Sequence, residues 1–357
     1  MPVLNPDGPL VPEFDVVING TAMTADMQAY VVGVSVDDQV ALPSMFTLEM
    51  AGSDEKGEEI PWIDDENLFS LGHVVEIKMG YSDKLETLFK GEITGLEPEF
   101  AFDRLPGLTV RGYDRRHRLQ LGRKTKTFVQ QKDSDIASQV ASGAGLTAQV
   151  TDSIVVHDYV VQANQTDMEF LQERARRIQF EVGIDDKTLF FRPVNNDASE
   201  VLTLKMEEDL LEFNPRLTSS SQISEVKVMG WSPKDKKSLM GQAGVGDESS
   251  TMGGQKSGAQ LVQGAFGDVA GIIATRPVMT QAEADQMAHA RLNERALTLI
   301  SGDGVCKGRT DLRSGTVIKI EGVGKRFSGQ YYVTGVVHQY SPQHSYQTHF
   351  TIRRNAS

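Results

Sequence analysis

The chain has 357 residues, of which 39% are hydrophobic and 24% are charged, and these values exclude a fibrous or disordered protein and indicate two or three globular domains. Its formal net charge of −13, from 36 basic and 49 acidic residues, excludes a general attraction to nucleic acid or to anionic lipid. No stretch approaches the roughly 18 apolar residues that a membrane span needs.

The cysteine count and the N-terminus both indicate a reducing compartment. Cys306 is the single cysteine, so no intramolecular disulfide can form and a thiolate zinc site lacks its ligands. The segment Met1–Pro12 has no basic start followed by an apolar run, which a secretory signal requires. We therefore expect assembly in the cytoplasm and no membrane insertion.

From Phe14 to Tyr113 apolar and polar residues alternate, which is the pattern of half-buried strands. Val75, Ile77 and Met79, for example, share one face of a strand. The same alternation predicts further strands at 31–36, 46–50, 87–94 and 108–113. The pattern predicts an antiparallel β-domain over residues 1–115.

The middle of the chain mixes helix and strand signals. Asp133 or Ser134 can cap a short helix that ends at Gly143. Further along, two strand-like runs flank a turn at Asp185-Asp186 and predict a β-hairpin. We interpret residues 116–200 as an α+β insert.

A second helix of the insert begins at a capping box. In Thr166-Asp167-Met168-Glu169 the threonine side chain accepts from the backbone of Glu169, whose side chain reaches back to the Thr166 backbone. The helical period then places Phe170 and Leu171 inward and Arg174, with its charged neighbours, mostly outward.

Strand signals return after residue 200 and define the third domain, over residues 201–357. They lie at 225–231, 315–321, 330–337 and 346–354. The segment 238–267 is rich in Gly, Ser and Gln and poor in large apolar residues, so we expect a mobile loop there. Thr280-Gln281-Ala282-Glu283 is another capping box and opens a helix.

Two segments of the chain resemble each other. Gly72–Arg111 and Gly315–Arg353 both place glycines between strand-like runs and both contain the pattern aliphatic-Thr-Gly, at 93–95 and 333–335. Their glycine spacings differ, 19 positions from Gly72 to Gly91 but 14 from Gly315 to Gly329, which leaves chance similarity as the alternative. A true repeat predicts that three chains in a ring present six similar domains.

The sequence contains no motif that compels an enzyme. It has no phosphate-binding loop, no G-x-S-x-G and no H-E-x-x-H. Two sets of residues remain as candidates for chemistry, namely the acids Glu97, Glu99 and Asp103 and the histidines His338, His344 and His349. Alternating acids on a strand usually form a solvated face. For the histidines, a metal site is less favoured than positions on the polar face of a strand. We therefore predict no catalytic residues, no cofactor and no metal.

One basic stretch departs from the acidic average. It comprises Arg104, Arg111, Arg115, Arg116, His117, Arg118, Arg123, Lys124 and Lys126. A nucleic-acid patch is one interpretation. We favour pairing with carboxylates of this chain or of a neighbouring subunit. The candidate interface residues are Arg111, Arg115, Arg116 and Arg118.

The segments Arg111–Leu119 and Tyr159–Ala175 resemble the late-control-protein D family of phage tails. That family is similar to the N-terminal hub part of VgrG proteins and to the central baseplate hub of contractile tails. Gly329–Thr334 and Phe350–Arg354, with His338 between them, also resemble the family's C-terminal pattern. The resemblance covers nearly the whole chain.

The resemblance implies an α+β, mainly β fold, in which two tube-like antiparallel β-barrel domains, 1–115 and 201–357, flank the insert 116–200. It also implies a homotrimer with pseudo-sixfold symmetry that adapts a hexameric inner tube to a trimeric spike. That role is structural. The alternative from another class is a tail-associated cell-wall hydrolase.

VgrG chains continue beyond the hub into a spike, whereas this chain ends at Ser357. We therefore expect a separate spike protein, together with an inner-tube or tube-initiator protein and other baseplate proteins as partners. No sequence-specific contact with nucleic acid is expected. The expected location is the cytoplasm during assembly, and then a phage tail or an extracellular contractile particle.

Overall fold

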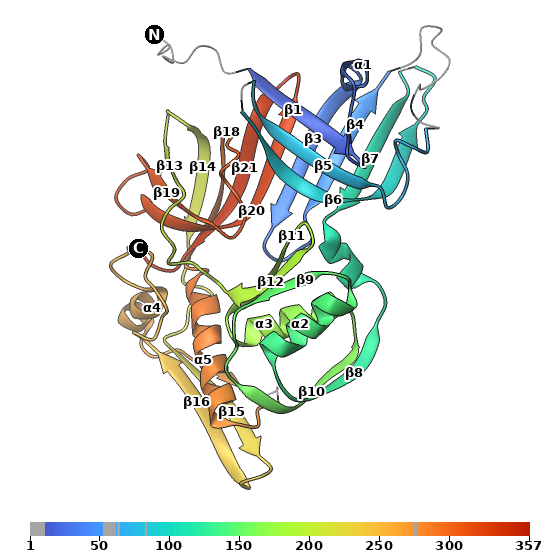
Figure 1. The fold of residues 1–357 in the computed structure, drawn as a ribbon. Helices are drawn as coiled ribbons and strands as arrows, with labels where there is room; N and C mark the ends of the chain where they lie inside the picture. The colour runs from blue at the N-terminus through green and yellow to red at the C-terminus, as the bar shows by residue number, and fades with distance from the viewer. Residues whose placement is uncertain (1–10, 53–61, 63–64, 83, 104, 275–276) are drawn as a thin grey trace.

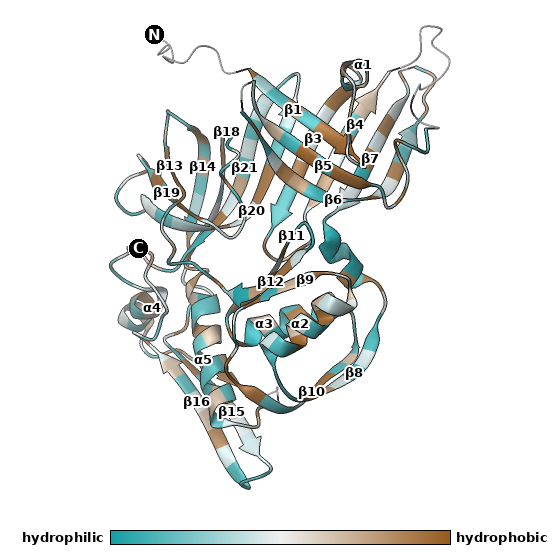
Figure 2. Ribbon diagram, viewed as in Figure 1, coloured by the Kyte–Doolittle hydropathy of each residue, from teal (hydrophilic) through white to brown (hydrophobic). Residues whose placement is uncertain are grey.

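The computed structural model describes residues 11–52, 62, 65–82, 84–103, 105–274 and 277–357 (Figure 1). Strands dominate, and hydropathy alternates along many of them (Figure 2). The mainly β fold with an α+β insert, predicted from the alternation and the resemblance, is confirmed. No helix in the described ranges has the length and apolar character to cross a membrane.

The first β-region is the part of the chain from residue 12 to residue 113. Its elements are β1 (Pro12–Ile18), β2 (Thr21–Ala22), α1 (Ala25–Gln28), β3 (Val31–Gln39), β4 (Met45–Ala51), β5 (Val74–Tyr81), β6 (Lys84–Glu99) and β7 (Gly107–Tyr113). The alternating residues identified above point into one core, where Ile77 and Met79 are fully buried.

The insert follows the first β-region and has a core of its own. Its elements are the 3-10 helix η1 (Arg115–Gln120), β8 (Lys124–Lys132), α2 (Asp133–Gly143), β9 (Thr147–Val150), β10 (Val156–Gln165), α3 (Asp167–Arg177), β11 (Phe180–Asp185) and β12 (Thr188–Pro193). The capping box at Thr166 is confirmed, with Glu169 N donating to Thr166 Oγ1 at 3.1 Å and Thr166 N donating to Glu169 Oε2 at 3.0 Å. The predicted hairpin is β11–β12.

The second β-region completes the chain and carries an inserted outer module. The region consists of β13 (Leu202–Lys205), β14 (Leu210–Leu217), β18 (Ile300–Lys307), β19 (Val317–Glu321), β20 (Gly329–Ser341) and β21 (Ser345–Arg354). The outer module consists of β15 (Glu225–Ser232), β16 (Lys237–Gly244), α4 (Gly258–Phe266), β17 (Ala270–Ile273) and α5 (Gln281–Ala296). The module lies between β14 and β18 in the sequence and projects from the β-regions alongside the insert (Figure 1).

The two β-regions share one 13-stranded sheet, with the strand order β14-β18-β21-β20-β3-β4-β7-β6-β5-β1-β2. In addition, β19 pairs with β20, and β13 pairs with β19. The two regions join where β3 pairs antiparallel with β20, from Val34 opposite Tyr340 to Gln39 opposite Gly335. Each region has its own apolar core, and the core of the first region extends across the junction to Tyr346 of β21.

The internal repeat predicted from the glycine patterns is real. Gly72 N donates to Ile93 O at 2.8 Å in the first region, and Gly315 N donates to Val333 O at 2.9 Å in the second. Both glycines have positive φ, 86° and 77°, a backbone conformation that other residues rarely adopt. The structure keeps the alignment of Gly72 with Gly315 but makes Gly91 equivalent to Tyr331 rather than to Gly329, which explains the unequal glycine spacings.

The two β-regions also share their strand irregularities. The ladder between β6 and β7 shifts register at 93–95, and the ladder between β20 and β21 shifts at 333–335. The ladder between β3 and β4 shifts at 31–33, and the ladder between β14 and β18 shifts at 210–212. β3 is therefore equivalent to β14, and β6 is equivalent to β20.

The structure differs from the expected mobile loop at 238–267. This stretch contains most of β16, which pairs with β15 along its length, and α4, which is capped by Ser257. The small residues serve close packing, because a Cβ at Gly241 would lie 2.1 Å from the carbonyl oxygen of Ala284 in α5. Composition indicated disorder, but the small residues make room for a helix.

Candidate functional site

Arg116 ties the start of the insert to the first β-region. Asp114 directly follows β7 and caps η1, and its Oδ1 accepts a hydrogen bond from Arg116 N at 2.7 Å. The Arg116 guanidinium donates to Asp114 Oδ2 at 2.8 Å, to Ser44 Oγ at 2.7 Å and to the Gln39 carbonyl at 3.0 Å. Arg116 is 3% exposed, so its charge is satisfied inside the chain.

The Glu92 carboxylate binds two further arginines of η1. Arg115 Nε donates to Glu92 Oε1 at 3.2 Å, and Arg118 Nε donates to Glu92 Oε2 at 2.9 Å. Arg115 also binds Asp186 at the tip of the β11–β12 hairpin. Glu92 and Arg115 are both buried, so this ionic cluster fixes η1 and the hairpin against β6.

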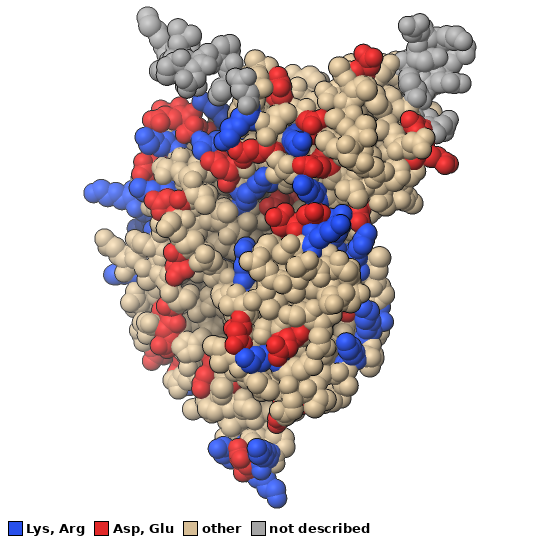
Figure 3. Space-filling model, viewed as in Figure 1, with Lys and Arg blue, Asp and Glu red and all other residues tan. Residues whose placement is uncertain are grey.

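Most described members of the basic stretch pair with acids of the same chain, whereas Lys126 lies over the Phe128 ring. Arg111 Nε donates to Glu97 at 3.1 Å, and both side chains are exposed. Two further pairs are Arg123 with Glu169 and Lys124 with Asp167. Figure 3 shows basic and acidic side chains interspersed where the β-regions meet the insert. These pairings disfavour a free phosphate-binding patch, whereas a subunit-interface role for Arg111, Arg115, Arg116 and Arg118 stays a prediction. Arg104 lies outside the described residues.

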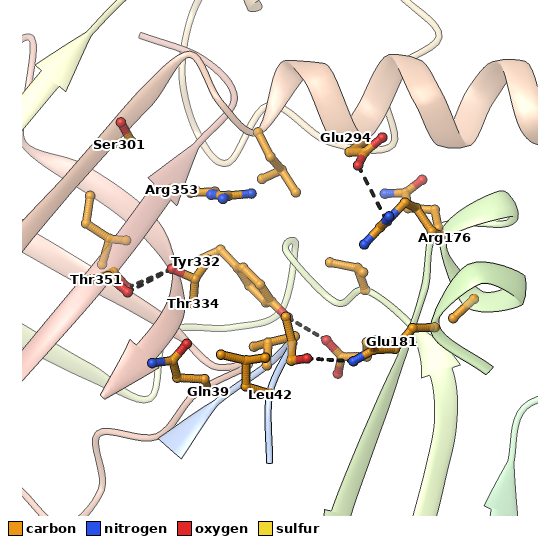
Figure 4. Close-up of a pocket in the computed structure, with 18 of the residues that line it drawn as sticks. Gln39, Leu42, Arg176, Glu181, Glu294, Ser301, Tyr332, Thr334, Thr351 and Arg353 are labelled. Atoms are coloured by element: carbon orange, nitrogen blue, oxygen red, sulfur yellow. Dashed lines mark hydrogen bonds and ion pairs between the residues drawn. The ribbon is translucent and has the colours of Figure 1, made fainter. Parts of the chain in front are cut away.

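A cleft of about 1020 Å³ opens where the insert, α5 and the second β-region meet (Figure 4). Glu181 of β11, Glu294 of α5 and Tyr332 of β20 project into it. Tyr332 Oη donates to Glu181 Oε2 at 2.6 Å, and Arg192 Nε donates to Glu181 Oε1 at 2.9 Å. Burial, with the neighbouring Glu181 carboxylate, raises the pKa of Tyr332.

Two further pairs of polar side chains are labelled in the cleft in Figure 4. Thr334 Oγ1 lies 3.0 Å from Thr351 Oγ1, and Arg176 Nε lies 3.9 Å from Glu294 Oε1. No histidine or cysteine lines the cleft among the residues that the structure describes. The bond from Tyr332 to Glu181 joins the second β-region to the insert across this cleft.

The insert contains a buried ionic cluster that no sequence pattern predicted. Arg174 Nε donates to Asp133 Oδ1 at 2.5 Å, and His157 Nε2 lies 3.2 Å from Asp133 Oδ2. Burial alone would raise the pKa of Asp133, but the hydrogen bond from His157 and the Arg174 charge together lower it.

This cluster corrects two expectations about the insert. Arg174 is 6% exposed rather than outward. Asp133 is the first residue of α2, whose N-cap is Lys132. The available signal was the acid in the first helical turn, but nothing local pairs it with an arginine 41 positions later.

The three candidate histidines and the single cysteine are separated or buried. His338 is fully buried, with Nδ1 2.9 Å from Tyr346 Oη, and burial together with the Arg313 charge lowers its pKa to about 3. His344 lies in the exposed β20–β21 turn, and His349 faces the polar side of β21. Burial raises the pKa of the Cys306 thiol to about 12. In the described part of the chain no three His, Cys, Asp or Glu side chains gather as a metal-binding group.

The acids proposed for a hydrolase lie on an exposed surface. Glu97 is paired with Arg111, Glu99 ends β6, and Asp103 is in the turn beyond it. None of the three lines one of the clefts found in the described structure. The geometry therefore offers these carboxylates no enclosed substrate site.

Comparison with known sequences gives one family. The family model described as Alg8 N-terminal domain matches residues 9–342. No curated protein matches the chain.

Solved structures with the same fold come from phage tails and a secretion system. A 43 kDa tail protein of prophage MuSo2 from Shewanella oneidensis is 12% identical, with a TM-score of 0.72 over 96% of this chain and 98% of that one. A tail protein from Neisseria meningitidis is also 12% identical, with a TM-score of 0.70 over 96% and 97%.

An Escherichia coli component of the type VI secretion system is 16% identical, with a TM-score of 0.58 over 92% of this chain and 74% of that one. That protein is described as structurally similar to the bacteriophage T4 tail proteins gp27 and gp5. At these identities the likeness shows a shared fold.

Proposed function

We propose that this chain, which belongs to the Alg8 N-terminal domain family, is a structural baseplate hub of a contractile tail or injection system. Three copies form a pseudo-sixfold ring that adapts a hexameric inner tube to a trimeric spike. The fold shared with tail proteins of two bacteria and with a secretion-system component supports this role.

The observation that carries the proposal is the internal repeat. The first and second β-regions share strand equivalences, positive-φ glycines and ladder shifts. A chain with two copies of one template presents six equivalent units when three chains close a ring. Such a ring has threefold symmetry in its chains and near-sixfold symmetry in its β-regions.

The finer assignments belong to the same proposal. The hub resembles late control protein D and the N-terminal part of VgrG, with residues 1–115 and 201–357 as tube-like domains and 116–200 as the insert. Its partners are a separate spike, an inner-tube or tube-initiator protein and other baseplate proteins. Assembly takes place in the cytoplasm, before the particle is released as a phage tail or an extracellular contractile particle.

The native mass of the purified chain tests the ring. Native mass spectrometry should give about 118 kDa, three times the chain mass of 39.2 kDa. A mass of two or four chains would contradict the threefold ring. If the chain is a monomer by itself, co-expression with the spike protein must produce the three-chain species, because a partner that binds only the trimer stabilises it.

Cell-wall zymography tests the alternative hydrolase. We expect no clearing, since no enclosed site surrounds the candidate acids. Clearing that disappears in Glu97→Ala or His349→Ala would contradict a purely structural role.

A further inference from the structure

Among the strand edges of the sheet that have no strand partner in the described residues, two are related by the repeat. One is the outer edge of β14, which is the terminal strand on its side of the sheet. The other is the second half of β6, from Gly95 to Glu99, which pairs with β7 on one side only. Open edges expose backbone donors and acceptors that a further strand can satisfy.

The repeat relates these two open edges to the junction that is already formed inside the chain. β3 is equivalent to β14, and β20 is equivalent to β6, by their matched register shifts. Within the chain, the outer edge of β3 pairs with the second half of β20. The same edges of β14 and β6 are the ones that remain open.

The matched shifts also transfer the register residue by residue. Val36 of β3 corresponds to Pro215 of β14. Val36 lies opposite Phe46 of β4 and Pro215 lies opposite Gly302 of β18, and both pairs are the same number of residues beyond their ladder shifts. His338 corresponds to Pro98, three residues beyond Gly335 and Gly95. Since Val36 lies opposite His338, the repeat places Pro215 opposite Pro98.

We propose that the outer edge of β14 in one copy of the chain pairs antiparallel with residues 95–100 of β6 and the adjoining turn in the next copy. The inference rests on the proposed ring, and it names the surfaces that close it. The facing pairs, with the β6 side first, are Leu96 with Leu217, Glu97 with Arg216, Pro98 with Pro215, Glu99 with Asn214 and Phe100 with Phe213.

The chemistry of these pairs is complementary. Glu97 lies opposite Arg216, a carboxylate facing a guanidinium, and Glu97 is 58% exposed although it already binds Arg111. Leu217 is 38% exposed and Phe100 is 71% exposed in the single chain, so both gain apolar cover. Opposite charges and apolar pairs directly across a ladder are the favourable cross-strand combinations.

The prolines at the centre limit what else each edge can bind. Thr218 N donates to Leu299 O, so alternate residues of β14 bond β18 and the backbone position of Pro215 faces outward. By the same equivalence Pro98 faces outward on β6. The proposed ladder therefore has no hydrogen bond at the Pro98–Pro215 position, and neither edge offers an unrelated strand a continuous row of donors. The side-chain pairs on either side of the prolines supply the specificity.

Disulfide trapping with the full chain tests this pairing. Glu97 and Arg216 form a non-hydrogen-bonded pair, for which the backbones approach to about 4.5 Å, within reach of a disulfide. Under mild oxidation the variant Glu97→Cys/Arg216→Cys should give a covalent three-chain species on a denaturing gel. The wild-type chain is the negative control and should not cross-link, because its single cysteine, Cys306, is fully buried.

Two further variants serve as matched controls. Glu99→Cys/Thr218→Cys uses the same two strands but is four residues out of register, a separation of about 13 Å, and should not cross-link. Asp37→Cys/Val337→Cys lies at the equivalent pair inside the chain and should close within one chain. Single variants Glu97→Cys and Arg216→Cys should each stay uncoupled alone and give a two-chain species when mixed.

The outcomes separate this inference from the proposed ring. A native trimer in which only the out-of-register pair, or neither pair, cross-links would overturn the strand pairing and keep the ring. An open ladder of two, three, four and more cross-linked chains would support the pairing and contradict closure at three. A monomer that forms no cross-link, alone or with the spike, would contradict both.

Discussion

The two β-regions use one strand template and differ in what they attach to it. In the first region the turn from β3 to β4 spans residues 40–44, whereas the equivalent connection in the second region, residues 218–299, holds the outer module. The outermost strands differ as well, because β1 is antiparallel to β5 and β13 is parallel to β19. The shared ladder shifts lie in the strands that build the junction, while the differences lie at the periphery.

Equivalent positions of the two regions also hold the insert by different chemistry. Glu92 lies opposite both Val74 and Tyr113, and Tyr332 lies in the corresponding place of β20. Glu92 reaches the β11–β12 hairpin through Arg115, whereas Tyr332 bonds directly to Glu181 of β11. One attachment is ionic and the other is a phenol-to-carboxylate hydrogen bond.

The largest expected effect comes from breaking the ionic attachment. Glu92→Ala leaves Arg118 unpaired and leaves buried Arg115 with Asp186 only, so the free energy of unfolding should fall by about 3 kcal/mol. Urea denaturation monitored by circular dichroism measures the change. Glu97→Ala is the matched control on the same strand, because its exposed pair with Arg111 should contribute less than about 1 kcal/mol. Equal losses in the two variants would contradict the attachment role of Glu92.

A pH-dependent difference between the regions comes next. The second region buries His338, whose pKa is lowered to about 3, while the first region has Pro98 at the equivalent position. Below about pH 6.5 this histidine binds a proton in the unfolded chain but not in the folded one. The free energy of unfolding should therefore fall by up to about 1.4 kcal/mol for each pH unit from 6.5 down to 4.5.

His338→Gln should reduce the slope of the unfolding free energy against pH by up to about 1.4 kcal/mol per pH unit, the contribution of one proton. Thermal unfolding followed between pH 7 and pH 4.5 measures the slope for wild type and variant. His344→Gln, at an exposed turn, should keep the wild-type slope. An unchanged slope in His338→Gln would show that acid sensitivity arises elsewhere.

The smallest expected effect comes from the second attachment. Tyr332→Phe removes one hydrogen bond to Glu181, which keeps Arg192, so the loss should be about 1 kcal/mol. Urea denaturation measures this loss against that of Glu92→Ala. A loss as large as that of Glu92→Ala would mean that the two attachments are energetically alike.

Local signals in the sequence predicted much of the fold. Alternation predicted β5, β7 and β21 because each has one buried and one polar face. The Thr166 box predicted the start of α3 because a cap depends on four adjacent residues. At α5 the cap also holds, but Glu283 accepts from Met279 N rather than returning to Thr280.

What the sequence did not reveal depends on distant partners. Arg174 is buried because Asp133 lies beside it in space, and helical periodicity alone assigns an arginine to the surface. Segment 238–267 is structured because β15 and α5 receive it. The arginines of η1 were identified as charge-paired, but their partners Glu92 and Asp186 lie 23 and 71 positions away, beyond the reach of any local pattern.

The buried state of Cys306 has a practical consequence. Its side chain is inaccessible, and burial raises the pKa of the thiol to about 12. Maleimide dyes should therefore not label Cys306 in the folded protein. A cysteine introduced on the exposed tip of the outer module, for example Lys236→Cys, would then carry the only fluorophore of each subunit. Counting photobleaching steps on single particles would report directly how many copies one assembled particle contains.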